Sequence, residues 1–123
     1  MEQARADWVL ASDARSVTRA RTLIAQRLIG LPDESVEVVL LLVSELVTNA
    51  VRHGSGPVGL HVAWGNGTVR VEVHDQSPEW PVVRAVDRDA LDGRGLILVD
   101  GLATGWGVMA GKPGKTVWFT AKA

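Results

Sequence analysis

Apolar residues recur at the 3.6-residue spacing of an α-helix in two segments in the first half of the chain. The first segment follows Ser12 and Asp13, and either side chain can cap a helix by accepting a hydrogen bond from a free backbone N–H. It runs to about Leu28. The second segment opens at Asp33 and continues to His53, where glycines and a proline break the chain. The pattern therefore predicts two helices.

The second helix has a broad apolar surface. Further apolar residues flank its hydrophobic stripe near the start, so the first turns are apolar almost all round. Such a helix is expected to be covered on more than one side and to lie at the centre of the domain. The stripe itself consists of Val36, Val39, Leu40, Val43, Leu46, Val47, Ala50 and Val51.

Alternation of apolar and polar residues predicts strands in the rest of the chain. Residues 6–10 can form a short first strand. Residues 58–75 alternate on both sides of a Gly-Asn-Gly sequence at 65–67, which is a tight-turn signal, and they are predicted to form a β-hairpin. Residues 104–109 and 116–121 predict a second hairpin.

The region between the two hairpins has a different character. Residues 76–92 contain two prolines and several charges and keep neither period, which predicts a long loop. Loops of this length in compact domains usually serve a function or are disordered. Residues 96–100 then form an apolar stretch that we predict as a short buried helix. The order of strands and helices as a whole predicts an α+β two-layer sandwich.

The composition is that of one globular domain. The chain has 123 residues, 46% of them hydrophobic and 22% charged, and residues 1–123 are predicted to form a single domain. A net charge of −1 gives no case for a nucleic-acid partner, and no apolar run is long enough to span a membrane. The absence of cysteine excludes disulfides and thiolate chemistry and fits a cytoplasmic location.

Glu45, Asn49 and His53 are spaced four residues apart on the second predicted helix. Side chains at this spacing lie along one face of a helix, here at the edge of the apolar stripe, where polar groups are costly to bury without partners. A carboxylate can act as a base or hold a water, and an amide oxygen can bind Mg²⁺. Glu45 and Asn49 therefore point to phosphate chemistry. The alternative is a solvated helix edge that carries a polar pair.

Asp75 stands at the end of the first predicted hairpin. A turn-forming aspartate is common at such a position. The functional alternative is a buried carboxylate that accepts a hydrogen bond from an exocyclic amine, which would select adenine over guanine.

Gly93, Arg94 and Gly95 precede the short predicted helix. Paired glycines let backbone N–H groups approach phosphates at a helix N-terminus, and Arg94 adds a positive charge. Residues of about 76–95 would then form a lid over the nucleotide. The alternative is a flexible loop end.

Gly114, Lys115 and Thr116 are similar to the end of a P-loop, but we reject that interpretation. The P-loop pattern requires a glycine five residues before Gly114, where Met109 stands. A helix should also follow, whereas residues 117–119 are strand-like. A hairpin turn is the better interpretation. The three histidines of the chain lack metal-ligand spacing.

Taken in order, these motifs resemble the four boxes of the GHKL ATPases, which have the Bergerat ATP-binding fold. The resemblance covers residues from about 8 to 121. The small size and the Glu-Leu-Val-Thr-Asn-Ala sequence resemble the bacterial anti-sigma-factor serine/threonine kinases, especially their short actinobacterial paralogues. The positions that carry the resemblance are residues 45–50 with His53 and Gly54, then Asp75, residues 93–96 and residues 114–116.

The resemblance implies a protein kinase that uses ATP and Mg²⁺. Glu45 would be the base or water-positioning residue, and Asn49 would be the Mg²⁺ ligand. Asp75 would bind the adenine amine, the glycines at 93 and 95 would contact phosphates, and Thr116 would lie near the adenine pocket. The nucleotide-binding positions implied in this way are Asn49, His53, Asp75, Gly93, Arg94, Gly95 and Thr116.

The resemblance also implies partner proteins. Kinases of this type bind a sigma factor and phosphorylate a serine on an antagonist protein, and they commonly form homodimers. Two alternatives stay open. One is a non-catalytic or weakly nucleotide-binding module that acts by sequestering a partner. The other is an ATPase domain detached from a histidine kinase, and the lack of a dimerisation helix pair with a phosphoacceptor histidine argues against it.

The chain departs from the family pattern at two places. The adenine box usually continues with glycines two and four residues after the aspartate, whereas Asp75 is followed by Gln76, Ser77, Pro78 and Glu79. Sporulation-type kinases also carry an arginine shortly before the lid glycines. This chain has Leu91 there, so Arg88 or Arg94 would have to substitute. Both departures concern the pocket and its lid rather than the fold.

Overall fold

The computed structural model describes the chain apart from residues 1–2, 54–55, 78–97 and 112. Residues 98–102 form a helical turn in which Val99 is buried, in part where the short buried helix was predicted. Most of the predicted loop and lid lies outside the described residues. The elements are β1 (Ala4–Leu10), α1 (Arg15–Arg27), α2 (Asp33–His53), β2 (Val58–Gly65), β3 (Thr68–Asp75), β4 (Gly105–Ala110) and β5 (Lys115–Lys122).

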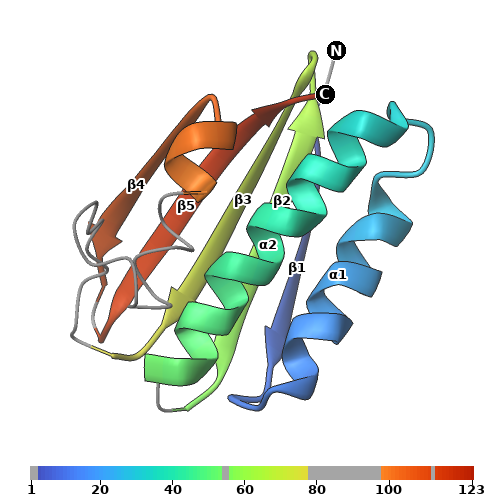
Figure 1. The fold of residues 1–123 in the computed structure, drawn as a ribbon. Helices are drawn as coiled ribbons and strands as arrows, with labels where there is room; N and C mark the ends of the chain where they lie inside the picture. Colours follow the sequence, from blue (N-terminus) through green and yellow to red (C-terminus); the bar gives the residue numbers. More distant parts are fainter. Residues whose placement is uncertain (1–2, 54–55, 78–97, 112) are drawn as a thin grey trace.

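The described strands form one antiparallel sheet in the order β1-β2-β3-β5-β4. Both helices lie on the same face of this sheet, with α2 across its middle and α1 beside it (Figure 1). The two predicted hairpins are β2 with β3 and β4 with β5, and the pairing of β3 with β5 joins them. The arrangement confirms the predicted α+β two-layer sandwich.

The turn between β2 and β3 follows from its two central residues. Asn66 and Gly67 have φ angles of 54° and 78°, and Gly65 pairs with Thr68 across the turn. Positive φ at both central positions defines a type I′ turn, whose twist matches that of the flanking strands. The Gly-Asn-Gly sequence therefore specified this hairpin correctly.

The start of α1 depends on Asp13 rather than on Ser12. Asp13 Oδ1 accepts the backbone N–H of Arg15 at 2.7 Å, and the Asp13 carbonyl accepts the N–H of Ser16 at 2.9 Å. The hydrogen bond from the Arg15 guanidinium, together with the backbone N–H bond, lowers the pKa of the Asp13 carboxyl. Ser16 Oγ donates to the Ala11 carbonyl, which fixes the approach of the chain to the helix.

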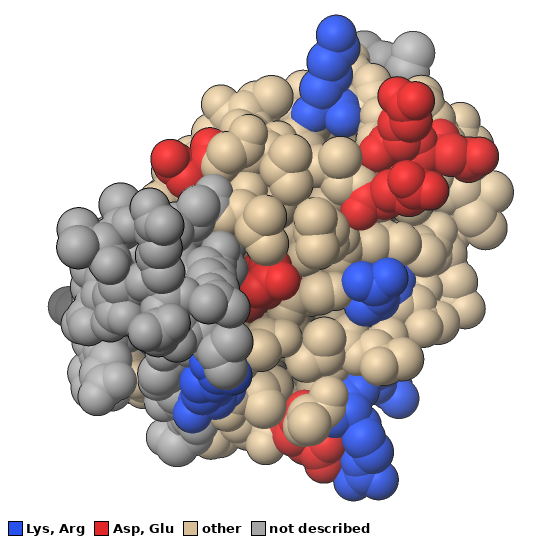
Figure 2. All heavy atoms as spheres, in the orientation of Figure 1, with Lys and Arg blue, Asp and Glu red and all other residues tan. Residues whose placement is uncertain are grey.

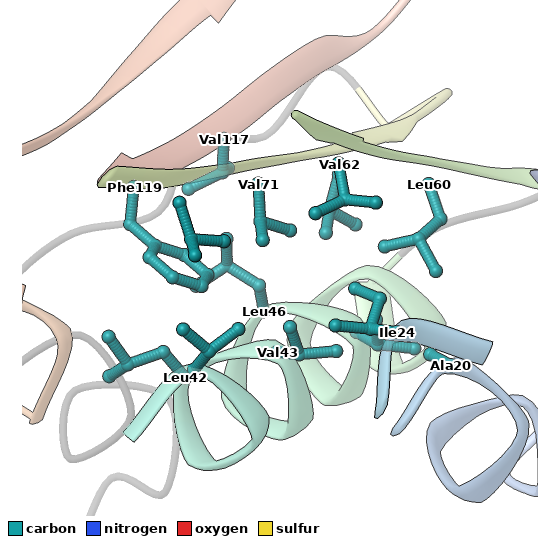
Figure 3. Packing of buried hydrophobic residues seen from close by; sticks show 14 of the residues in the cluster. Ala20, Ile24, Leu42, Val43, Leu46, Leu60, Val62, Val71, Val117 and Phe119 are labelled. Atoms are coloured by element: carbon teal, nitrogen blue, oxygen red, sulfur yellow. The ribbon is translucent and has the colours of Figure 1, made fainter. Parts of the chain in front are cut away.

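The hydrophobic core fills the space between the helices and the sheet. Leu46 of α2 lies opposite Val71 and Phe119 of the sheet, and all three are at most 3% exposed (Figure 3). Ile24 of α1 is fully buried next to Val43 of α2 (Figure 3). Burial of one such side chain contributes about 1.5–3 kcal/mol. This core holds α2 in a fixed position over the middle strands, so residues at the edge of its apolar stripe are held in place as well.

Strand register decides which side chains face the helices. Alternate side chains along a strand point to opposite faces of the sheet. Val73 of β3 pairs with Val117 of β5, and both are buried on the helix-covered face. The next pair on that face is Asp75 with Lys115, where β3 ends and β5 begins. Two charged residues therefore occupy the last inward-facing positions of the two strands.

Candidate functional site

The end of α2, the end of β3 and the start of β5 lie at the same end of the molecule (Figure 1). α2 packs against both of these strands. The candidate site is built from the polar residues that these three elements bring to that end.

Glu45 and Asn49 lie one turn apart on α2, and both side chains are half-buried. Leu46 and Ala50, the residues that follow them, are buried against the sheet. Within the described residues, neither polar side chain has a hydrogen-bond or ion-pair partner. The core thus anchors the helix while a carboxylate and a carboxamide remain available at its edge.

Asp75 is the most buried of the predicted site residues that the structure describes, because only 5% of its side chain is exposed. Its Oδ1 accepts a hydrogen bond from Lys115 Nζ at 2.9 Å and another from the backbone N–H of Ser77 at 2.9 Å. The Lys115 side chain is also 5% exposed, and its Nζ lies 3.5 Å from the carbonyl oxygen of Ser77. A buried carboxylate and a buried ammonium therefore compensate each other.

The second carboxylate oxygen of Asp75 is in a different situation. Oδ2 has no hydrogen-bond partner among the residues that the structure describes. Among the same residues, every side-chain nitrogen or oxygen that is sealed from solvent has a hydrogen-bond partner. Oδ2 is therefore at the surface of the site and can accept a hydrogen bond from a ligand.

The contact with Ser77 explains how the chain turns without the usual glycines. An aspartate that accepts the N–H of the residue two positions later forms an Asx-turn. Asp75 thus stabilises its own turn through Oδ1, as the simpler interpretation of this residue proposed, and it is also a buried carboxylate. The two interpretations are compatible because each uses a different oxygen.

Sequence reasoning missed Lys115, which we had assigned to a hairpin turn. The available signal was the alternation of β5, because Lys115 precedes Val117 and Phe119 on the inward-facing side of the strand. The predicted strand began one residue too late, at position 116, and so left this residue out. A lysine in an inward-facing position requires an acidic partner, and Asp75 is that partner.

Thr116 lies on the opposite face of the sheet from Asp75. Its Oγ1 is 3.1 Å from Nδ1 of His74, its cross-strand neighbour. Both residues line a shallow hollow of about 290 Å³ on the face that the helices do not cover, together with His61 and Glu72. The structure therefore does not bring Thr116 to the Asp75 carboxylate, and Lys115 occupies that place.

Gly114 allows the two strands to meet closely at the site. Its φ is +82°, and a Cβ at this position would lie 1.9 Å from the carbonyl oxygen of Asp75. The Gly111 N–H donates to the Gly114 carbonyl at 2.8 Å and closes the predicted turn. Gly114 is thus required for two reasons: its own φ is positive, and the backbone of β3 leaves no room for a Cβ.

Several residues of the predicted site lie outside the described part of the chain. They are the His53 side chain, Gly93, Arg94, Gly95 and most of the lid.

The residues that the structure does place suit a nucleotide with Mg²⁺. No group of three histidine or acidic side chains among the described residues forms a metal site on its own. Mg²⁺ is usually bound through one or two protein oxygens together with substrate phosphates. Asn49, with Glu45 one turn away, matches that requirement. Oδ2 of Asp75, which has no partner among the described residues, matches an exocyclic amine.

Residues 10–121 match the sequence family of the histidine kinase-like ATPase domain. The chain belongs to this family. The match spans both helices, strands β2 to β4, β5 up to residue 121 and the Asp75–Lys115 pair, and it includes only the last residue of β1. A search of the curated proteins gives no match.

Solved structures show the same fold. The chain is 24% identical to the blue-light activated histidine kinase of Erythrobacter litoralis, with a TM-score of 0.60 over 89% of this chain and 41% of that one. A histidine kinase domain from the same protein gives a TM-score of 0.58 at 24% identity, covering 91% of this chain and 61% of that one. The Acinetobacter baumannii histidine kinase AdeS gives 0.54 at 9% identity, covering 95% and 67%.

The chain thus spans about half the length of the two Erythrobacter structures. As a histidine kinase-like ATPase domain of the GHKL superfamily, it has the α+β fold that the motifs implied. Among the described residues, no helix has the length and hydropathy needed to cross a membrane.

Proposed function

We propose that this domain binds ATP with Mg²⁺ and transfers the γ-phosphate to a serine of an antagonist protein. The observation that carries nucleotide binding is the Asp75 carboxylate, which is buried yet keeps Oδ2 without a partner among the described residues. The resemblance to anti-sigma-factor serine/threonine kinases supports the serine substrate and a sigma factor as the second partner. It also supports a homodimer.

Asp75, Asn49 and Glu45 each have one task in this proposal. Asp75 Oδ2 accepts the exocyclic amine of the base and orients the nucleotide. The Asn49 amide oxygen holds Mg²⁺, which neutralises the charge that develops on the phosphates. Glu45 takes the proton of the attacking serine hydroxyl as general base. Phosphoryl transfer depends mainly on positioning and charge stabilisation, and α2 is held rigidly for this purpose by its core contacts.

A second function is favoured by one feature of the site. The glycines that usually follow the adenine-binding aspartate are replaced, and Oδ1 of Asp75 is occupied by Lys115 and Ser77. A pocket built in this way supports a module that binds nucleotide weakly or not at all and acts by sequestering a partner.

Calorimetric titration with ATP, with and without Mg²⁺, separates the two functions. Mg²⁺-dependent binding with a Kd between micromolar and sub-millimolar supports the kinase proposal. Incorporation of labelled phosphate into candidate antagonist proteins then tests transfer. Absence of any heat of binding would rule out the ATP-dependent function and make the sequestering module the better account.

A further inference from the structure

His61 and His74 are neighbours on the sheet face that α1 and α2 leave uncovered (Figure 1). His74 of β3 pairs with Gly59 of β2, and His61 follows Gly59 by two positions on the same strand. The two histidines are therefore diagonal neighbours across the strand pair, a relation in which ring side chains can still reach each other. Both line the hollow of about 290 Å³ on this face.

The imidazole of His61 is held by Asp7 of the neighbouring strand β1. Its Nδ1 bonds to Oδ1 of Asp7, and 26% of the His61 side chain is exposed. An ionised carboxylate only accepts hydrogen bonds, so Nδ1 carries the hydrogen and Nε2 keeps its lone pair. Nε2 has no partner among the described residues. A ring that is fixed through one nitrogen by a carboxylate is the usual state of a metal-binding histidine.

The imidazole of His74 is held in a similar way from the other side. Its Nδ1 is 3.1 Å from Oγ1 of Thr116 on β5. A hydroxyl oxygen can accept a hydrogen bond, so Nδ1 of His74 can carry the hydrogen as well. In the part of the chain that the structure describes, Nε2 of His74 has no partner. The hollow therefore contains two imidazoles whose Nε2 atoms are both available to a ligand.

The charges around the hollow favour a cation. Asp7 and Glu72 line it, and neither lysine nor arginine is among its lining residues. Glu72 is paired with Arg70, so Asp7 supplies most of the uncompensated negative charge. Neutral imidazole is a ligand that suits Zn²⁺ and Cu²⁺, whereas Mg²⁺ prefers oxygen. The chemistry of the hollow therefore matches a transition-metal ion.

We propose that His61 and His74 bind one divalent transition-metal ion, such as Zn²⁺ or Cu²⁺, through their Nε2 atoms. No third histidine or acidic side chain among the described residues completes a metal site with them, so water supplies the other ligands. The site lies on the opposite face of the sheet from α2, which carries Asn49. It is therefore separate from the Mg²⁺ ligand proposed above and does not depend on nucleotide binding.

The test is a calorimetric titration of the nucleotide-free protein with Zn²⁺ alone, because ATP itself binds metal ions. The proteins compared are the wild type, His61→Ala, His74→Ala and His53→Ala. His53 is the third histidine of the chain and ends α2, the helix on the other face, so its substitution is the matched control. The wild type and His53→Ala are expected to bind one Zn²⁺ per chain with equal affinity.

His61→Ala and His74→Ala are each expected to bind Zn²⁺ about 10–100-fold more weakly, because each loses one of two protein ligands. Asp7→Asn keeps both ligands and is expected to weaken binding by about ten-fold, the lower end of the effect of a residue that orients a metal ligand. Equal affinity in the wild type, His61→Ala and His74→Ala would overturn the proposal. So would a loss of affinity confined to His53→Ala.

Electron paramagnetic resonance of the wild type with one equivalent of Cu²⁺ gives a readout that does not depend on any variant. The nitrogen couplings are expected to show two imidazole ligands per ion. One imidazole or none would overturn the proposal, and this result decides even if a histidine variant fails to fold. Loss of the Zn²⁺ site would leave the proposed ATP binding untouched, since that function is measured with ATP and Mg²⁺.

Discussion

Asp75 and Lys115 are cross-strand neighbours at the junction of β3 and β5, and their side chains form a buried ion pair with a distance of 2.9 Å between Oδ1 and Nζ. The pair is 40 residues apart in sequence. It closes the polar end of a core that is otherwise apolar along these strands. The same two groups therefore affect the stability of the sheet and, in the proposed function, the chemistry of the nucleotide pocket.

Asp75→Asn is expected to destabilise the fold because it leaves the Lys115 ammonium buried without a counter-charge. Breaking a buried pair in this way costs about 3–5 kcal/mol. The free energy of unfolding, measured by urea denaturation, should fall by this amount. The double variant Asp75→Asn/Lys115→Met removes both charges and should recover most of the loss.

The double variant separates stability from ligand binding. It should fold like the wild type and yet bind ATP more weakly, since the carboxylate that receives the base amine is gone. If the single and double variants were equally unstable, the ion pair would not be the cause of the loss.

Gly114→Ala is expected to destabilise the protein more than Gly67→Ala. The two glycines have nearly the same φ, +82° and +78°, but a Cβ at Gly114 would lie 1.9 Å from the Asp75 carbonyl, whereas none of the surrounding atoms is within 4 Å of a Cβ at Gly67. The unfavourable φ costs each variant about 1–2 kcal/mol. The clash should add about 1–3 kcal/mol for Gly114 only. Thermal unfolding of the two variants measures the difference, and equal values would contradict the close approach of the strands.

Glu45→Ala is expected to slow phosphate transfer by about 10²–10⁴-fold while leaving ATP binding nearly intact, because a general base contributes to the transition state rather than to the ground state. Transfer to the antagonist protein is measured under single-turnover conditions. Glu37→Ala, an exposed glutamate on the same helix, is the control. Wild-type transfer by Glu45→Ala would remove this residue from the chemistry.

Asn49→Ala is expected to weaken nucleotide binding only when Mg²⁺ is present. Its half-buried amide has no partner among the described residues, so the substitution removes a ligand rather than an internal contact. Calorimetric titrations in Mg²⁺ and in a chelator, with the same protein, give the comparison. An equal loss of nucleotide affinity with Mg²⁺ and with the chelator would assign Asn49 to nucleotide positioning or to structure. Unchanged affinity in both conditions would exclude Asn49 from the site.

Local signals predicted most of the fold and part of the site. The period of α2 predicted which of its residues are buried, and Glu45 and Asn49 do lie at the edge of that buried stripe. The prediction for Thr116 depended on the family resemblance, and strand alternation places its side chain on the other face of the sheet. A shift of one residue along a strand reverses the face, so the residue of β5 whose side chain meets Asp75 is Lys115 and not Thr116.

The sequence by itself determined the elements and their order, because helix period, strand alternation and the Asn66–Gly67 turn are properties of neighbouring residues. Only the tertiary structure decided that β3 pairs with β5 and that Lys115 meets Asp75. That contact joins residues from two different hairpins, and no periodicity within either hairpin specifies the register between them. The packing of α2 against both strands puts the helix that carries Glu45 and Asn49 over the sheet face that carries the pair.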